Sequence, residues 1–106
     1  LAQIGHGCKV GFGCAIAGQT GLAGGVEIGN RVILAGQTGI ANESKIGDGA
    51  VVAAKAGVHN DIPAGETYCG NPAMPYKQFL KVSAILKRLP EMYQSIKQLQ
   101  NQIAQK

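Results

Sequence analysis

The chain has 106 residues and a formal net charge of +4, with 16 glycines, three tyrosines, two phenylalanines and no tryptophan. A hydrophobic content of 45% argues against disorder, and glycine does not recur at every third residue, which excludes collagen. No apolar run reaches the roughly 18 residues that a membrane helix needs, and no signal peptide opens the chain.

Glycine and charge are unevenly distributed. All the glycines lie between residues 5 and 70, and residues 1–76 carry four basic and five acidic side chains, a net charge of −1. Residues 77–106 carry six basic side chains and one acidic side chain, a net charge of +5. This basic tail favours either an acidic partner or a solvated helix face. No basic patch is interleaved with aromatic residues, so no nucleic-acid partner is expected.

Residues 1–60 contain a strict six-residue repeat. An aliphatic residue stands at every sixth position, and glycine or alanine follows it at the first nine of these positions. A small or β-branched residue stands two positions before each aliphatic residue. Neither the 3.6-residue period of a helix nor the two-residue period of a strand explains this spacing. The aliphatic residues are Ile4, Val10, Ile16, Leu22, Ile28, Leu34, Ile40, Ile46, Val52 and Val58.

This repeat predicts an all-β, parallel β-helix, in which three faces of six residues make one 18-residue coil. The aliphatic residues point into a core too narrow for an aromatic side chain, and small residues form the turns. Segment 16–24 is echoed by segment 34–42, which also indicates a repeat of 18. Residues 18 apart are therefore expected to stack about 4.8 Å apart. The predicted columns are His6–Gly24–Asn42–Asn60, Gln19–Gln37 and Thr20–Thr38.

The repeat ends after Val58. Residues 61–75 are punctuated by proline and glycine and are interpreted as a loop that caps the last coil. Residues 76–106 are predicted to form one helix over roughly 76–89 and another over roughly 91–105, with a bend at Pro90. Apolar residues at alternating spacings of three and four form an a/d seam, which needs a partner and favours a symmetric oligomer. The seam consists of Val82, Ile85, Leu89, Met92, Ile96, Leu99 and Ile103.

His6 is the main candidate for acid–base chemistry. It lies two residues after the core residue Ile4, so it is expected at an exposed turn, where an imidazole suits a general base. Gly24 stacks one coil away, and its backbone amide could donate to a developing oxyanion. A base and an oxyanion donor about 5 Å apart suit acyl transfer. His59 is interpreted as a loop residue near the cap.

A metal site is the rival interpretation for the two histidines. Zinc needs three or four ligands, but His6 and His59 are 53 residues apart and miss a 54-residue stacking by one. Cys8, Cys14 and Cys69 lack zinc-binding spacing and are expected to be reduced thiols in a cytoplasm. No metal is predicted, and a metal-dependent hydratase on the same fold is a minor alternative.

Three segments in order resemble the UDP-3-O-acylglucosamine N-acyltransferases of lipid A biosynthesis. They are QIGHGCKVG at 3–11, IAGQTGLAG at 16–24 and YCGNPAMPY at 68–76, and the tail from Phe79 to Pro90 is similar to that family's C-terminal helices. The resemblance covers essentially the whole chain but only the C-terminal third of such an enzyme. It implies a left-handed parallel β-helix followed by a C-terminal α-helical segment.

The resemblance also implies an activity. A 3-hydroxyacyl chain, carried on the phosphopantetheine of acyl carrier protein, passes to the 2-amino group of UDP-3-O-(3-hydroxyacyl)glucosamine, and the transferase needs no cofactor of its own. His6 matches the family's catalytic histidine, and Gly24 matches the glycine whose amide stabilises the oxyanion. Such enzymes are homotrimers of Gram-negative-type bacteria with active sites between neighbouring β-helices. The seam would then form a three-helix bundle, and the basic tail could face acidic acyl carrier protein.

Two features depart from the family's pattern. Some members have a second histidine in the region where Asn42 and Glu43 stand, so His6 is left as the main candidate base. The family's N-terminal uridine-binding domain and early coils are absent from these 106 residues, so this chain alone is expected to trimerise with little or no turnover. The alternatives are another hexapeptide-repeat O- or N-acyltransferase or acetyltransferase, and a non-catalytic β-helix that serves as a trimerisation scaffold.

Overall fold

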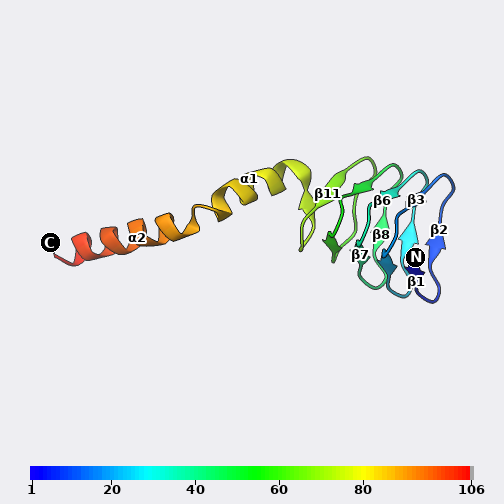
Figure 1. Cartoon of the computed structure of the whole chain (residues 1–106), viewed down its shortest axis with the longest axis horizontal. Coiled ribbons are helices and arrows are strands. Elements are labelled where there is room, and N and C mark those ends of the chain that lie inside the picture. Colours follow the sequence, from blue (N-terminus) through cyan, green and yellow to red (C-terminus); the bar gives the residue numbers. More distant parts are fainter. Residues whose placement is uncertain (106) are drawn as a thin grey trace. The chain divides into compact units, whose positions relative to one another are not determined.

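The computed structural model describes residues 1–105, in which short strands are followed by two helices (Figure 1). The chain divides into two compact units. The first, Leu1–Tyr76, contains the strands of the described residues, and the second begins at Lys77.

Strands recur every six residues through residues 3–58, at the positions of the sequence repeat. They are β1 (Gln3–Ile4), β2 (Lys9–Val10), β3 (Ala15–Ile16), β4 (Gly21–Leu22), β5 (Glu27–Ile28), β6 (Ile33–Leu34), β7 (Gly39–Ile40), β8 (Lys45–Ile46), β9 (Val51–Val52) and β10 (Gly57–Val58), followed by β11 (Thr67–Cys69) and β12 (Met74–Pro75). Each repeat strand pairs in parallel with a strand 18 residues away, so Gln3 lies beside Gly21. The sheets have the orders β1-β4-β7-β10, β2-β5-β8 and β12-β11-β9-β6-β3. The predicted parallel β-helix is confirmed, with about four turns.

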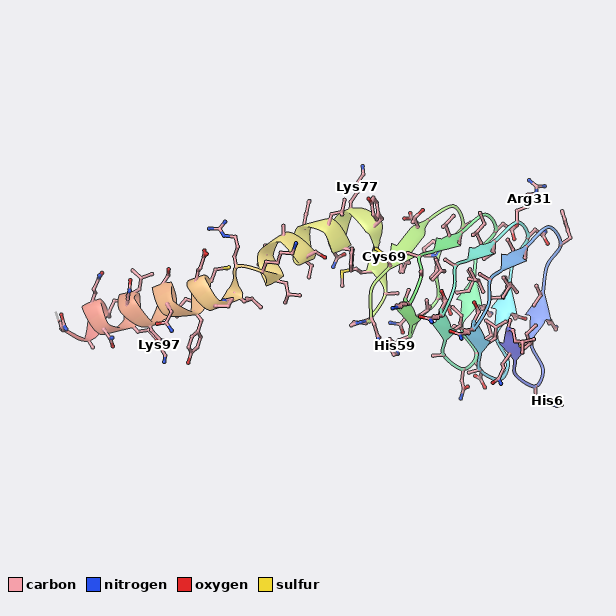
Figure 2. All side chains as sticks on the ribbon, in the orientation of Figure 1. His6, Arg31, His59, Cys69, Lys77 and Lys97 are labelled. Carbon is pink, nitrogen blue, oxygen red and sulfur yellow. The ribbon has the colours of Figure 1, made fainter. Side chains whose placement is uncertain are left out.

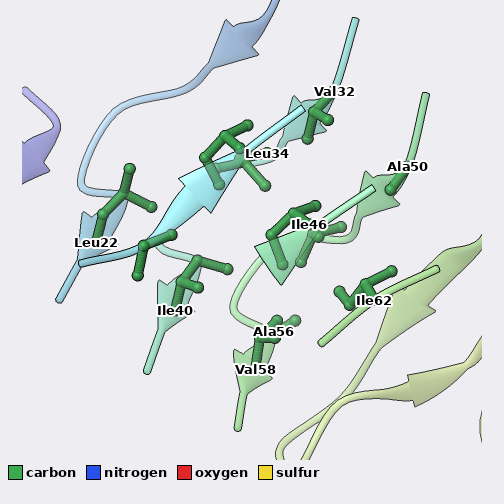
Figure 3. Close-up of a cluster of buried hydrophobic side chains, with 12 residues drawn as sticks. Leu22, Val32, Leu34, Ile40, Ile46, Ala50, Ala56, Val58 and Ile62 are labelled. Carbon is green, nitrogen blue, oxygen red and sulfur yellow. The ribbon is translucent and has the colours of Figure 1, made fainter. Parts of the chain in front are cut away.

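The aliphatic residues of the repeat fill a narrow core, as predicted (Figure 3). From Leu22 to Val58 each of them is at most 4% exposed. Ile4 and Val10 differ, at 55% and 42% exposed, because the first coil packs against a neighbouring coil on one side only. Complete burial of such a side chain contributes about 1.5–3 kcal/mol, so the stacking of coils stabilises the fold.

The segment 61–75 is not the simple loop that the sequence predicts. Ile62 is 2% exposed and forms a parallel bridge with Ile46, and β11 pairs in parallel with β9. Strand β12 then returns antiparallel to β11. The interpretation as a loop was wrong because the core spacing shortens here: Ile62 follows Val58 by four residues, and partners in this coil lie 16 residues apart instead of 18.

Stacked polar side chains support the columns predicted from the sequence. Gln37 Nε2 donates a hydrogen bond of 2.7 Å to Gln19 Oε1. The hydroxyls of Thr20 and Thr38 are buried and both donate to the carbonyl oxygen of Ala35, at 3.3 and 2.7 Å. The register of 18 therefore holds for side chains as well as for the backbone.

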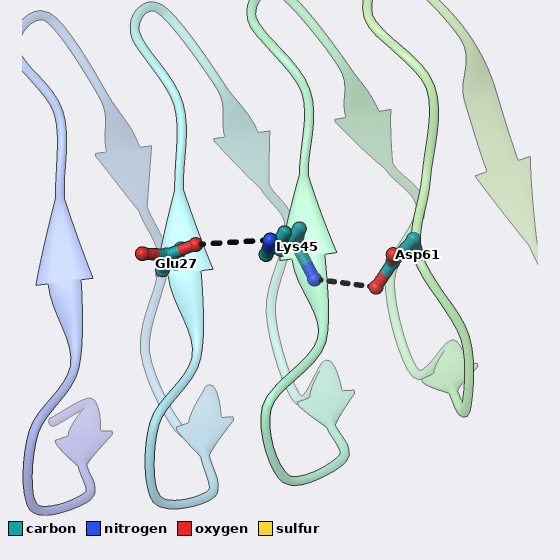
Figure 4. A network of polar contacts seen from close by, with 3 residues as sticks. All are labelled: Glu27, Lys45 and Asp61. Atoms are coloured by element: carbon teal, nitrogen blue, oxygen red, sulfur yellow. Dashed lines mark hydrogen bonds and ion pairs between the residues drawn. The ribbon is translucent and has the colours of Figure 1, made fainter.

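The outward residues of two of the sheets differ in chemistry. On β2-β5-β8, Lys45 Nζ lies 3.9 Å from Glu27 Oε2, and the backbone N–H of Lys45 donates to Asp61 Oδ1 at 2.8 Å (Figure 4). On β4, β7 and β10 the outward residues are all glycine. The first surface is therefore charged, and on the second the outward positions of these three strands carry no side chain.

Close stacking gives one prediction on stability. A Cβ on Gly47 would lie 2.6 Å from the Cα of Ala64 and 2.9 Å from the carbonyl carbon of Pro63, whereas a Cβ on Gly39 would meet no atom within 4 Å. Gly47→Ala is therefore expected to lower the free energy of unfolding by about 1–3 kcal/mol, and Gly39→Ala to change it by less than about 0.5 kcal/mol. Urea denaturation at one protein concentration measures both, and equal losses would contradict the described stacking.

Two helices follow the strands, and all of their side chains are at least partly exposed. Helix α1 is Tyr76–Leu86 and α2 is Leu89–Ala104, with Pro90 in the first turn of α2. The predicted break near Pro90 is confirmed, although α1 ends three residues earlier than expected. The seven seam residues are between 40% and 72% exposed. No helix within residues 1–105 is long and apolar enough to cross a membrane.

Candidate active site

His6 lies in the turn between β1 and β2, at an exposed corner of the first coil (Figure 2). Its imidazole makes no hydrogen bond to another group within residues 1–105. Its backbone is held, because the carbonyl oxygen of His6 accepts a hydrogen bond of 3.0 Å from the N–H of Gly25. The turn therefore fixes the position of the imidazole while leaving its nitrogens accessible to a ligand.

Gly24 lies at the same corner, one coil further on. A Cβ on Gly24 would lie 3.4 Å from the carbonyl oxygen of His6, so the predicted stacking of these two residues is observed. The carbonyl oxygen of Gly24 accepts a hydrogen bond of 3.0 Å from the N–H of Glu43. The N–H of Gly24 donates to no acceptor in the described part of the chain.

A second corner shows how the turn amides of this β-helix can be capped. There, the N–H of Phe12 donates to Asn30 Oδ1 at 3.0 Å, and the N–H of Asn30 donates to Asp48 Oδ1 at 2.8 Å. Each of these amides is thus capped by the side chain that stacks above it. At the His6 corner Gly24 stands in the place of Asn30 and has no side chain to cap the N–H of His6, and Asn42 stands in the place of Asp48 but makes no hydrogen bond to the N–H of Gly24 within the described residues. Sequence reasoning missed this contrast, although comparison of the two columns contains the signal.

The corner combines the two groups that acyl transfer needs. An accessible imidazole can take a proton from an attacking nucleophile, and an open N–H about one strand spacing away, roughly 4.8 Å, can donate to an oxyanion. The N–H of Gly24 does not need a buried site to be held in place, because the hydrogen bonds between neighbouring coils already fix the backbone of the turn.

The other sequence candidates lie elsewhere. His59 follows β10, and its Nε2 lies 3.2 Å from Asn71 Oδ1. Since β1 and β10 are the outer strands of one sheet, His59 is about three strand spacings, or roughly 14 Å, from the His6 corner. The residues described contain no group of three or more His, Cys, Asp or Glu side chains able to hold a metal ion.

A shallow groove follows the glycine surface from β1 to β10. A Cβ on Gly21 or Gly39 would meet no atom within 4 Å, so packing within the described chain does not require glycine at these two positions. At the far end, the side chain of Asn71 lies directly over Gly57, where a Cβ would be 2.7 Å from its Cγ. The groove is lined by Gln3, Gly21, Leu22, Ala23, Gly39, Ile40, Ala41, Gly57, Val58, His59 and Asn71.

The cysteines are free thiols and do not contribute to this corner. Cys8 Sγ donates to the carbonyl oxygen of Ala23 at 3.1 Å, and Cys14 Sγ donates to that of Gly29 at 3.0 Å. Burial raises the pKa of the Cys69 thiol, which disfavours the reactive thiolate. All three cysteines therefore act as small packing residues.

Comparison with solved structures defines the class of protein. Perosamine N-acetyltransferase from Caulobacter crescentus, in complex with CoA and GDP-perosamine, superposes with a TM-score of 0.68 and 31% identity over 70% of this chain and 35% of that chain. Another perosamine-related structure from the same organism, PerB, has a TM-score of 0.55 and 22% identity, which supports the fold alone. No protein-family model matches the chain. The β-helix is that of the hexapeptide-repeat acyltransferases.

Sequence comparison identifies the particular family. The chain is 71% identical over 100 residues to the UDP-3-O-acylglucosamine N-acyltransferase of Nostoc punctiforme, covering 94% of this chain and 29% of the relative. It is 64% identical over 103 residues to the enzyme of the same name from Trichormus variabilis, covering 97% of this chain and 30% of the relative. The chain belongs to this family, and it spans about three tenths of the length of these relatives.

Proposed function

We propose that this chain forms the acyl-transferring region of a UDP-3-O-acylglucosamine N-acyltransferase, with His6 as general base and the Gly24 amide as oxyanion donor. The observation that carries the proposal is the His6–Gly24 corner, where an accessible imidazole stacks beside an uncapped backbone N–H. The names of the relatives support the reaction type, since they transfer an acyl group to nitrogen.

The proposed reaction forms an amide from a thioester. The 2-amino group of UDP-3-O-(3-hydroxyacyl)glucosamine attacks the carbonyl carbon of a 3-hydroxyacyl thioester on acyl carrier protein. His6 accepts the proton that the amine loses as the C–N bond forms. The N–H of Gly24 stabilises the negative charge on the carbonyl oxygen. The C–S bond then breaks, and His6 returns the proton to the departing sulfur.

The exposed seam and the basic tail support the proposed partners, a homotrimer and acyl carrier protein. Seven apolar residues on α1 and α2 are exposed in the single chain, which favours assembly into a homotrimer through a three-helix bundle. The net charge of +5 on residues 77–106 suits an acidic carrier protein. The three free thiols suit a cytoplasmic enzyme, where cysteines stay reduced.

One observation supports a different acyl donor, acetyl-CoA. The structural relative from Caulobacter crescentus is an N-acetyltransferase solved with CoA. An acetyl-CoA-dependent sugar acetyltransferase is therefore the competing function for this chain.

The two functions can be distinguished by the acyl donor that the enzyme uses. The chain should be placed in a chimera that supplies the remainder of the Nostoc punctiforme relative, and product masses measured with each donor. We expect transfer of a 3-hydroxyacyl group from acyl carrier protein to UDP-3-O-(3-hydroxyacyl)glucosamine, and little turnover by the 106-residue chain alone. Acetyl transfer from CoA without transfer from the carrier protein would contradict the proposal.

A further inference from the structure

Charged residues on the strands of the β-helix are confined to one of its three faces. The sheet β2-β5-β8 presents Lys9, Glu27 and Lys45, which lie beside one another in register. The strands of the other two sheets contain no charged residue. Because burying an unpaired charge is unfavourable, the two uncharged faces are the ones that another protein surface can cover.

The sheet that contains β3, β6 and β9 presents an aliphatic surface. We define it by the outward residues of these strands, Ala15, Ile33 and Val51, which are register partners. Ile33 is 47% exposed, whereas its neighbours Val32 and Leu34 lie in the core. Stacked aliphatic side chains on one face favour contact with another apolar surface over contact with water.

The glycine surface of β4, β7 and β10 offers the matching shape. A Cβ on Gly21 or Gly39 would meet no atom within 4 Å, and neither glycine has a left-handed backbone. Glycine inside a strand weakens the strand and often marks a place where another backbone or a ligand approaches closely. Since packing within the described chain does not require these two glycines, their space is available to side chains from outside, such as a row of aliphatic residues.

The glycine and aliphatic surfaces share one corner of the β-helix, formed by the turns at residues 18–19, 36–37 and 54–55. Three copies around a three-fold axis form a closed ring when one surface of each copy contacts a different surface of the next. The glycine and aliphatic surfaces can do this when their shared corner lies at the axis, and the charged face then points to solvent. Gly18, Gly36 and Ala54 are small enough for close approach at that corner, and the long stem of Lys55 lets its ammonium reach water.

This arrangement places two different corners next to each other at the outer rim of the contact. One is the His6 corner, which borders the glycine surface, and the other borders the aliphatic surface of the second copy. The second corner contains Phe12, which is 65% exposed, and Arg31, whose guanidinium lies 5.7 Å from the centroid of the Phe12 ring. Exposed aromatic and arginine side chains are enriched where proteins bind each other.

The charges at these two corners have opposite signs. Arg31 forms no ion pair within the described residues, and neither does Glu43 at the facing corner. Both side chains extend toward the preceding coil. The Arg31 Cγ lies 3.3 Å from the Cβ position of Gly13, and the Glu43 Cγ lies 3.1 Å from that of Gly25. Asp48, the acidic residue at the Arg31 corner, already accepts a backbone N–H of its own chain at 2.8 Å. The cation and the free carboxylate are therefore complementary across such a contact.

We propose that the glycine surface of one copy packs against the aliphatic surface of a second copy, which brings Phe12 and Arg31 of the second copy beside the His6–Gly24 corner. The inference rests on the homotrimer of the proposed function and adds a contact between β-helices to the one along the helical seam. The seam holds the copies together, and the second contact completes the site. Each candidate active site is then built by two chains.

The test places one charge on each surface of the 106-residue chain. Ile33→Asp and Gly39→Lys are each expected to raise the concentration at which the trimer dissociates by about tenfold or more, because the new charge is buried without a partner. Ile33 and Gly39 lie on consecutive strands, β6 and β7. The double variant should therefore dissociate within about threefold of the parent concentration, because the aspartate of one copy meets the lysine of the next. Sedimentation equilibrium over a dilution series measures all three variants.

Lys9→Asp is the matched control, because it places an aspartate on the face that points to solvent. It should leave the dissociation concentration unchanged, and far-UV circular dichroism should show the same β-helix in every variant. Single variants that assemble like the parent, or a double variant that dissociates like the single ones, would overturn the proposal.

The mass readout separates this inference from the proposed function. If the His6→Ala chimera were fully active while the double variant recovered assembly, the proposed base would be wrong and the contact between β-helices would stand. If His6→Ala were inactive while the double variant failed to recover, the contact would be wrong and the role of His6 would stand. A parent chain that sediments as one chain at every concentration would overturn the inference together with the proposed homotrimer.

Discussion

Replacing His6 with alanine is expected to lower kcat/KM for amide formation by about 10²–10⁴-fold, the usual contribution of a general base. The loss follows from the geometry of the corner, where His6 is the imidazole that stacks beside the open N–H of Gly24. The variant should fold normally, because the side chain is exposed and makes no hydrogen bond within residues 1–105. Initial rates of the chimera with the acyl-carrier thioester measure the effect.

Asn60 supplies the matched control for this variant. Asn60 is exposed, like His6, and belongs to the same predicted column. It lies after β10, at the other end of the stack of coils. Asn60→Ala should keep kcat/KM near that of the parent chimera. Full activity of His6→Ala would favour the non-catalytic scaffold over the acyltransferase, because a trimerisation scaffold needs no base.

Placing aspartate at Ile96 is expected to abolish assembly through the helices. Ile96 is 54% exposed in the single chain and lies in the middle of the α2 part of the seam. In a three-helix bundle each chain would bury this side chain, and a carboxylate without a partner costs several kcal/mol there. Sedimentation equilibrium should change from three times the chain mass of 10.9 kDa to the mass of one chain.

Gln98 is the control for the seam variant. It lies on the same helix but two positions after Ile96, so it projects from the opposite side of α2. Gln98→Asp introduces the same charge and should leave the mass of the assembly unchanged. If Ile96→Asp kept the trimeric mass, the seam would not be the trimer interface and the β-helix would have to supply it.

Much of the first unit was predictable from the spacing of single residues. The buried aliphatic residues at every sixth position from Leu22 to Val58 are compatible with one arrangement of short strands. This arrangement determines both the fold and the register between neighbouring coils. The register in turn placed Gly24 beside His6, since residues 18 apart must stack. Pro90 marked the break between the helices because it lacks an N–H for the interior of a helix.

The remaining features depend on contacts that the repeat does not encode. Ile62 enters the core four residues after Val58, so a search for period six ends one coil too early. The open amide of Gly24 became evident only by comparison with Asn30, whose N–H is capped by Asp48. The direction of the Glu43 side chain depends on space above a glycine, which spacing alone does not reveal.

The central claim is that His6 acts as the base in acyl transfer at the corner it shares with Gly24. The most direct test is the rate of amide formation by the His6→Ala chimera as free imidazole is added. We predict a low rate that rises with imidazole concentration, while the parent chimera and Asn60→Ala do not respond. A His6→Ala chimera that is fully active, or one whose low rate does not respond to imidazole, would contradict the claim.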